Sequence, residues 1–165
     1  MLRKIRRGLT FVLTAVAAML SLAACGGEDA SAAWEVCRFA NKMPAGVVFE
    51  CDEAVYSPET AVITARLTND SVQGGISFGA DIYFAKKVGN RWGTVPGDYV
   101  FIMPMYGIGP DESHEFNAHT SMLEVKLDEG QYRLYKKVWI EDNAGRGKEY
   151  TVWAEFEVAG DAVAG

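Results

Sequence analysis

A serine and two histidines are the residues of this 165-residue chain that could act as a nucleophile with its base. Ser77 lies in Gly-Ile-Ser-Phe-Gly, which matches the G-x-S-x-G pattern of hydrolases that expose the serine on a turn between a strand and a helix. His114 and His119 follow it in the sequence. The residues around Ser77 alternate as in a strand, and no helical pattern follows them. We therefore expect no catalytic site. A small surface hydrolase that uses Ser77 with His114 or His119 is kept as an alternative function.

The same two histidines are the best candidates for metal binding, because they lie in an acidic stretch at residues 111–119. A protein metal site needs three or four ligands that converge on the ion. A spacing of five residues along a strand places His114 and His119 on opposite faces. The paired acidic residues elsewhere in the chain lack the spacing of a calcium-binding loop. We therefore predict no metal site and no cofactor.

Cys25 is the residue with the most specific chemistry. It follows a basic opening at residues 1–7, an apolar run at residues 8–22 and two alanines, which are the parts of a secretory signal. The apolar run is shorter than the roughly 20 residues that cross a bilayer comfortably. The sequence Leu-Ala-Ala-Cys that ends at Cys25 resembles the lipobox of bacterial lipoproteins. In that family the cysteine is diacylated on its thiol, and it becomes the first residue once the signal peptide is removed.

This resemblance implies that residues 1–24 are a lipoprotein signal peptide and that Cys25 is the lipidation site. Two acyl chains suffice for a stable membrane anchor. Residues 25–45 then comprise the lipidated cysteine, a flexible tether of small and acidic residues, and an N-terminal segment. We expect the protein on the extracytoplasmic face of the cell membrane. The alternative is an ordinary secreted protein in which the cysteine is coincidental.

The charge of the chain limits its partners. The whole chain has 16 Lys and Arg against 22 Asp and Glu, and four of the basic residues lie in the signal segment. The mature chain therefore has 12 basic and 22 acidic residues, a formal charge of −10. Because nucleic acid is bound mainly by neutralising its phosphates, we expect no nucleic-acid partner.

Once Cys25 is set aside, the two remaining cysteines form an even pair on the oxidising side of the membrane. A disulfide between Cys37 and Cys51 would join the N-terminal segment to the first long strand. The alternative is two separate thiols. Of these two possibilities, we predict the disulfide.

The dominant periodicity after residue 46 is that of β-strands. Apolar and polar residues alternate along residues 47–51, 61–67, 76–84, 130–140 and 150–158, and Gly89-Asn90 is a hairpin signal. About seven to eight strands with turn signals between them and no strong helical period indicate an all-β, two-sheet antiparallel sandwich. We place this sandwich at residues 46–159, with a C-terminal tail at residues 160–165.

One turn is more informative than the others. Leu127 is followed by Gly130 and then by Tyr132, directly before a strand. This pattern resembles the tyrosine corner of immunoglobulin-like sandwiches, in which the phenol enters the core and its hydroxyl bonds the backbone a few residues upstream. Together with the strand pattern, it makes residues 47–158 similar to the bacterial immunoglobulin-like domains of Gram-positive lipoproteins and sensor ectodomains. The resemblance implies no catalytic residues.

Large aromatic residues fall on the outward side of the predicted strands. In an immunoglobulin-like strand order, Tyr83, Tyr135, Trp139 and Trp153 would share one outer face, and exposed contiguous aromatics mark interaction sites. We predict this face as the binding face. Two alternatives remain open: the N-terminal segment, through Trp34 and Phe39, covers the face, or a bulge near Lys136 breaks the alternation. Strict alternation would otherwise turn that lysine inward.

The sequence as a whole predicts a membrane-anchored, extracytoplasmic lipoprotein. Its immunoglobulin-like domain is expected to act as a non-catalytic interaction module of the cell envelope, with a protein or a cell-wall glycan as its partner. The alternatives are the small surface hydrolase described above and a structural spacer without a ligand.

Overall fold

The computed structural model describes residues 34–70, 74–102, 104–141 and 146–160. Cys25, the predicted signal peptide, the tether and residues 161–165 lie outside these ranges. Within them the chain forms eleven strands and one short 3-10 turn, η2 (Thr120–Met122), and no α-helix. The strands are β1 (Val36–Cys37), β2 (Val47–Cys51), β3 (Val55–Tyr56), β4 (Val62–Asn69), β5 (Ile76–Phe78), β6 (Tyr83–Val88), β7 (Arg91–Thr94), β8 (Tyr106–Ile108), β9 (Ser113–His119), β10 (Gly130–Glu141) and β11 (Gly147–Val158).

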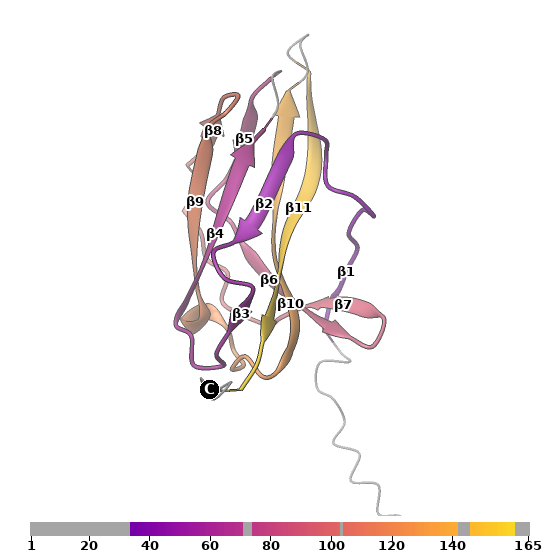
Figure 1. The fold of residues 1–165 in the computed structure, drawn as a ribbon, viewed down its shortest axis with the longest axis vertical. Coiled ribbons are helices and arrows are strands. Elements are labelled where there is room, and N and C mark those ends of the chain that lie inside the picture. Colours follow the sequence, from indigo (N-terminus) through magenta and orange to yellow (C-terminus); the bar gives the residue numbers. More distant parts are fainter. Residues whose placement is uncertain (1–33, 71–73, 103, 142–145, 161–165) are drawn as a thin grey trace, which may run out of the picture.

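The strands form two sheets that pack face to face (Figure 1). The larger sheet has the order β1-β7-β6-β10-β11-β3, and β5 and β8 extend it beside the second half of β10. The smaller sheet has the order β2-β4-β9. All pairs are antiparallel except β11 with β3. The predicted all-β immunoglobulin-like sandwich is confirmed, and the additional strands are pairs and triplets of residues that are too short to show a periodicity.

The core lies between the sheets and follows the alternation of the sequence. Every second residue of β4, β10 and β11 is buried, because successive side chains of a strand point to opposite faces. Fully enclosed examples are Ile63 and Leu67 on β4, Phe84 on β6, and Leu134 and Val138 on β10. The apolar area removed from water by these side chains is the main stabilising term of the fold.

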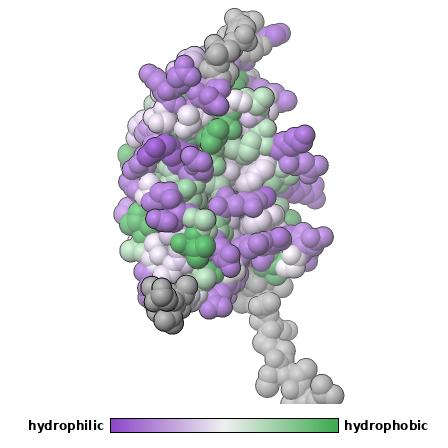
Figure 2. All heavy atoms as spheres, in the orientation of Figure 1, coloured by the Kyte–Doolittle hydropathy of each residue, from purple (hydrophilic) through white to green (hydrophobic). Residues whose placement is uncertain are grey.

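The outer side of the smaller sheet is polar. Arg66 pairs with Glu115 across β4 and β9 at 3.5 Å, and Thr64 donates a hydrogen bond to Asn117 at 3.0 Å. Figure 2 shows this side of the molecule, where hydrophilic side chains cover most of the surface and apolar ones form small patches. The smaller sheet thus has one buried and one solvated face, as is usual for antiparallel sheets.

Residues 76–84 form two strands and not the single strand that their alternation predicts. β5 and β6 both pair with β10, but residues 79–82 between them leave the sheet. The alternation of β10 is unbroken, so no bulge occurs and Lys136 points into the core, where it is fully buried. Its ammonium group donates hydrogen bonds to the carbonyl oxygens of Gly79, at 2.7 Å, and Asp81, at 3.0 Å. The lysine therefore satisfies carbonyl groups that the gap between the strands leaves without a sheet partner.

The predicted disulfide between Cys37 and Cys51 is wrong, since both residues are free thiols. Cys37 lies on β1, which pairs with β7 at the edge of the larger sheet. Cys51 ends β2, which pairs with β4 in the smaller sheet. The sequence spacing is short, but the chain crosses from one sheet to the other between the two residues. Burial raises the pKa of the Cys51 thiol to about 12, with a smaller contribution from Asp52.

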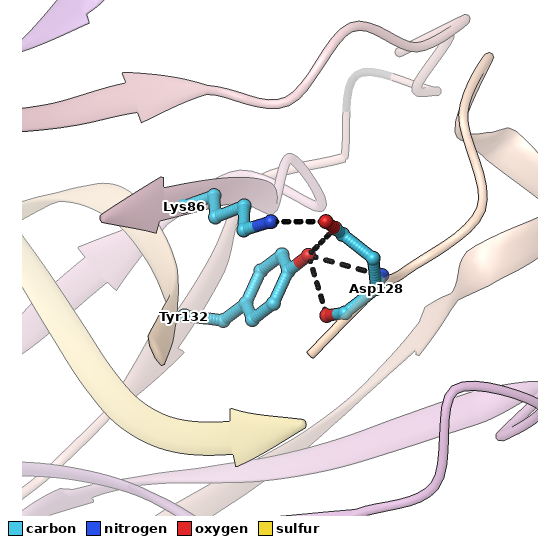
Figure 3. Close-up of polar contacts among 3 residues, drawn as sticks. All are labelled: Lys86, Asp128 and Tyr132. Carbon is cyan, nitrogen blue, oxygen red and sulfur yellow. Dashed lines mark hydrogen bonds and ion pairs between the residues drawn. The ribbon is translucent and has the colours of Figure 1, made fainter. Parts of the chain in front are cut away.

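The tyrosine corner forms as its residues indicate (Figure 3). Leu127 is buried, and Gly130 has a φ of 147°, a conformation that strongly favours glycine. The Tyr132 hydroxyl lies 3.0 Å from the carbonyl oxygen and 2.7 Å from the carboxylate of Asp128. The ammonium group of Lys86 binds the same carboxylate. This network holds the buried phenol at the start of β10.

A second tyrosine is held in the same way. Tyr56 is buried at the end of β3, and its hydroxyl donates a hydrogen bond to the carboxylate of Asp52, four residues earlier. The backbone N–H of Glu53 donates to the same hydroxyl at 3.1 Å. The rings of Tyr56 and Tyr132 both contact Phe156, with centroid distances of 5.4 and 5.6 Å. The two tyrosines therefore enclose one phenylalanine of β11.

Candidate interaction surface

The structure does not bring the residues of the hydrolase alternative together. Ser77 lies on the outward side of β5, next to Trp139 of β10. His114 lies on the inward side of β9, where its ring packs against Phe78 and Phe116 at 5.1 and 4.8 Å. The larger sheet thus separates the hydroxyl from the imidazole, and a serine–histidine pair needs hydrogen-bonding distance. Burial lowers the pKa of His114, as does the nearby Lys136.

The described ranges contain neither a metal site nor a membrane-spanning helix. No group of three or more His, Cys, Asp and Glu residues there could hold a metal ion. Among the same residues no helix has the length and apolar character needed to cross a membrane. What remains is the outer face of the larger sheet.

The four aromatic residues of the predicted binding face do lie on one side of the larger sheet, but three of them are covered. Phe39 of the N-terminal segment packs on Tyr135 at 5.4 Å and on Trp153 at 5.6 Å. Trp139 remains exposed. The alternative in which Phe39 covers the face is therefore correct for Tyr135 and Trp153. Part of the apolar area of these two rings fixes the N-terminal segment, and both rings remain half-buried.

The same segment is held by polar contacts. The thiol of Cys37 and the hydroxyl of Thr94 are 2.9 Å apart, and the Thr94 hydroxyl is also 2.9 Å from that of Tyr135. The backbone N–H of Thr94 donates to the carbonyl oxygen of Glu35 at 2.8 Å. Burial raises the pKa of the Tyr135 phenol, so the phenol stays protonated and can donate in this chain. β1 is thus held both by its backbone and by its side chains.

Arg133 is the centre of a cation–π cluster beside this segment. Its guanidinium carbon lies 4.2 Å from the ring centre of Trp92, 4.7 Å from that of Phe39 and 4.9 Å from that of Trp153. The guanidinium also pairs with Glu155 on the neighbouring strand. A guanidinium that is partly desolvated between aromatic rings gains more from each contact than one in water. The cluster joins Phe39 of the N-terminal segment to β7, β10 and β11.

A groove of about 610 Å³ opens beside the cluster, which we call the β1–β7 groove. Indole rings line it, since Trp92 and Trp153 are among its walls. Arg38 and Arg91 also line it, are exposed, and form no ion pair with any other residue in the described part of the chain. The remaining lining residues are Val36, Cys37, Phe39, Ala40, Asn41, Asn90 and Arg133. The groove combines aromatic rings, amides and two unpaired positive charges in a chain that is acidic overall.

Farther along the same face, residues 99–102 lie over Tyr83. The rings of Tyr99 and Phe101 contact that of Tyr83 at 5.0 and 5.8 Å. The hydroxyl of Tyr99 donates a hydrogen bond to the carbonyl oxygen of Val95 at 2.6 Å, which fixes the segment. Tyr83, the fourth residue of the predicted face, is therefore covered as well, by a segment that the sequence did not single out.

Val100 and Ile102, which alternate with Tyr99 and Phe101, point away from the sheet and are 82% and 75% exposed. Met105, which directly precedes β8, is 66% exposed. With Trp139, which is 39% exposed, we call them the apolar crest. The signal for the crest was present in the sequence, because residues 99–110 contain no charged side chain. A run of this composition predicts a buried strand, and only the structure shows that half of it is exposed.

Comparison with known proteins gives one result. The family model described as a bacterial Ig-like domain matches residues 43–157. None of the curated proteins matches the chain. The matched residues include the strands from β2 to β10 and nearly all of β11, but they omit β1 and Phe39. The segment that covers Tyr135 and Trp153, and that forms one wall of the β1–β7 groove, therefore lies outside the part of the chain that matches.

Proposed function

The chain belongs to the bacterial Ig-like domain family, and from this premise we propose that it is a non-catalytic interaction module of the cell envelope. The proposal places it on the extracytoplasmic face of the membrane, anchored by acyl chains on Cys25. It binds an acidic cell-wall glycan in the β1–β7 groove. A protein partner is the competing outcome, and the experiments below separate the two.

The anchor is supported by the sequence alone. A basic opening, a short apolar run and Leu-Ala-Ala-Cys precede a tether of nine residues, 25–33, before the first described residue, Trp34. Two acyl chains on Cys25 give a lasting attachment, whereas one chain gives a reversible one. The direct test is the Cys25→Ser variant. We expect it to leave the membrane fraction and to accumulate with its signal peptide attached, and a variant that stays membrane-bound and is processed as before contradicts the anchor.

The composition of the β1–β7 groove is the observation that carries the binding proposal. Sugar rings pack their C–H faces on indoles, and Trp92 and Trp153 provide two such rings. The acidic groups of a glycan pair with guanidinium groups, and Arg38 and Arg91 are available because neither pairs within the described residues. Amide side chains such as those of Asn41 and Asn90 donate to and accept from hydroxyl groups. In a chain with a formal charge of −10 after processing, this groove is a local exception in charge.

The test is binding of the mature chain to purified cell-wall sacculi, measured by co-sedimentation. We expect the double variant Arg38→Ala/Arg91→Ala to bind at least tenfold more weakly, and added salt to weaken the wild-type protein in the same direction. The matched control is Lys126→Ala/Lys148→Ala, which removes the same charge from exposed positions outside the groove. Equal binding by wild-type and Arg38→Ala/Arg91→Ala protein contradicts the glycan site. Capture of an envelope protein that depends on the two arginines, without binding to sacculi, replaces the glycan with a protein partner.

A further inference from the structure

The apolar crest has no role in the glycan site, and its exposure needs another explanation. We propose that the crest docks on the surface of the lipid bilayer to which the chain is anchored, so that the crest end of the larger sheet lies toward the membrane and the β1–β7 groove, farther along β10, stays open to the cell wall. This inference rests on the lipid anchor of the proposed function. It adds a second membrane contact that is made by the folded domain itself.

The side chains of the crest have the chemistry of a membrane-contacting surface. Its members are three aliphatic or thioether side chains, Val100, Ile102 and Met105, and one indole, Trp139. Aliphatic side chains enter the acyl boundary of a bilayer, and tryptophan prefers the level of the headgroups. Soluble domains rarely expose a contiguous apolar patch unless it has a partner. No charged residue occurs between Asp98 and Asp111, so no charge in this segment has to be desolvated.

Trp139 of the crest lies on the outer side of the larger sheet, beside the strands β5 and β8, and Met105 leads into β8. In the strand register Trp139 lies opposite Ser77, which lies opposite Gly107. Met105 directly precedes β8 and is 66% exposed. Ser77 and Gly107 are small, which leaves Trp139 exposed beside them. At about 4.8 Å per strand, these three strands span about 10 Å.

The side chains of Val100 and Ile102 have no room to pack inward against the domain. The inward positions of the segment are taken by Tyr99 and Phe101, which pack on Tyr83. Tyr83 itself stacks on Tyr135, with ring centres 5.4 Å apart. Val100 and Ile102 are consequently held outward by an occupied aromatic layer. Their exposure is a property of the packed fold.

The short tether between Cys25 and Trp34 keeps the domain close to an anchoring membrane. The chain enters through β1, and Phe39 then crosses the same outer face that carries the crest. Nine residues reach at most about 30 Å, so an anchored Cys25 keeps the domain close to the bilayer. A tethered surface meets its target at a high effective concentration, and a weak apolar contact is then sufficient. With the crest on the lipid, the polar face of the smaller sheet points away from the membrane (Figure 2).

The crest and the β1–β7 groove are separate sites on this face. Arg133 beside the groove and Trp139 in the crest are six residues apart on β10, which corresponds to about 20 Å. Because the crest is uncharged and the mature chain is acidic, the bilayer contact should need no anionic lipid and should persist in high salt. This behaviour is opposite to that expected of the groove, so the two sites are distinguishable in one preparation.

The test uses the full lipidated protein in phosphatidylcholine vesicles whose acyl chains are partly brominated, which quenches nearby indoles. We expect Trp139 to be quenched, so that Trp139→Phe removes most of the quenchable emission. We expect the triple variant Val100→Ser/Ile102→Ser/Met105→Ser to lower quenching at least twofold. The control Val48→Ser/Val55→Ser replaces apolar side chains that are also exposed but lie outside the crest, and it should leave quenching unchanged.

Other outcomes would contradict either the crest proposal or the lipid anchor. Protein that floats with the vesicles and shows the same quenching with and without Trp139 overturns the crest proposal and leaves the anchor in place. Protein that does not float overturns the anchor. A chain that begins at Gly26, and so has neither the signal peptide nor the acylated cysteine, is then tested on the same vesicles, and only crest-dependent co-sedimentation keeps the inference. Crest-dependent dimers of this chain in solution, without vesicle binding, show that the crest contacts a second copy and overturn the lipid assignment.

Discussion

Two segments of this domain have the same five-residue pattern, Asp-Glu-x-x-Tyr, at residues 52–56 and 128–132. In both, the tyrosine is buried and its hydroxyl binds the aspartate four residues earlier. In both, the ring packs on Phe156, by its edge in one case and by stacking in the other. The two strands that flank β11 in the larger sheet, β3 and β10, are thus fixed to the same residue of β11 by similar local contacts.

The surroundings of the two tyrosines differ. Tyr132 starts β10, which pairs with β11, β6 and β5, and the Asp128 carboxylate also binds Lys86. Tyr56 ends β3, a two-residue edge strand, and Asp52 binds no described cation. Tyr132 is 1% exposed and Tyr56 7%. The pattern therefore supplies the hydrogen bond, and the position in the sheet decides how much of the fold depends on it.

The largest effect is expected where the two devices meet. Phe156→Ala removes the ring that both tyrosines contact, and truncating a buried phenylalanine costs about 3–5 kcal/mol. We expect a loss of this size in urea unfolding of the mature chain, with both tyrosine fluorescence signals altered. Phe156→Leu, which keeps most of the volume, should cost about 1.5 kcal/mol or less. Equal losses in the two variants would contradict a role for the shared ring.

The next effect separates the two segments by their backbones. Gly130 has a φ of 147°, whereas Ala54, the equivalent residue of the first segment, has no such requirement. Gly130→Ala should destabilise the domain by about 2 kcal/mol, since this region of φ is nearly closed to other residues. A Cβ there would also lie 3.1 Å from a side-chain carbon of Lys86. Gly107→Ala is the control, because a Cβ at Gly107 meets only ordinary contact distances, and it should change stability by about 0.5 kcal/mol or less.

The hydroxyl groups provide the direct comparison of the two tyrosines. Tyr132→Phe removes hydrogen bonds to both the backbone carbonyl and the carboxylate of Asp128, and we expect a loss of about 1.5 kcal/mol. Tyr56→Phe removes a bond to the exposed carboxylate of Asp52, which water can solvate, and we expect about 0.5 kcal/mol. Both losses of stability are to be measured by urea unfolding at pH 7. A larger loss for Tyr56→Phe would mean that the edge strand, and not the central one, limits the stability of the sandwich.

The sequence predicted the second of these segments and missed the first, for a physical reason. Leu127, Gly130 and Tyr132 are one turn followed by a long strand, and the hydrogen bonds of the Tyr132 hydroxyl to Asp128 are local. Tyr56 precedes no strand of its own, and its ring is buried by Phe156, which lies 100 residues later in the chain. The repeat of the Asp-Glu-x-x-Tyr pattern was the signal in the sequence that could have identified Tyr56 as a second buried tyrosine.

Local alternation also predicted the core of β4, β10 and β11 and the inward direction of Lys136, but it could not show what satisfies that ammonium group. The carbonyl groups of Gly79 and Asp81 become available only because the neighbouring strand is interrupted. The same limit applies to the interaction surface. Alternation placed Tyr83, Tyr135, Trp139 and Trp153 on one side, yet the coverage by Phe39 and by residues 99–102 depends on how the chain returns across the sheet.

The smallest expected effect concerns the charge of Asp128. Burial acts to raise the pKa of this carboxyl, but hydrogen bonds from Lys86 and Tyr132 outweigh it, so the pKa is lower in the folded chain than in the unfolded one. A carboxyl of this kind stabilises the fold above its unfolded pKa, near 4, and the contribution is lost as the pH falls through the folded pKa. The Asp128 side chain is largely exposed, so the effect should be a fraction of that of Tyr132→Phe.

We therefore expect the stability of the wild-type domain to fall more steeply between pH 5 and about pH 3 than that of Asp128→Asn, as measured by urea midpoints at each pH. At pH 7 the variant should be the less stable of the two, and the difference should shrink as the solution becomes acidic. Parallel pH profiles would show that Lys86 and Tyr132 do not favour the charged carboxylate. The same experiment on Asp52→Asn sharpens the comparison, because Asp52 has no lysine partner among the described residues and its removal should change the slope less.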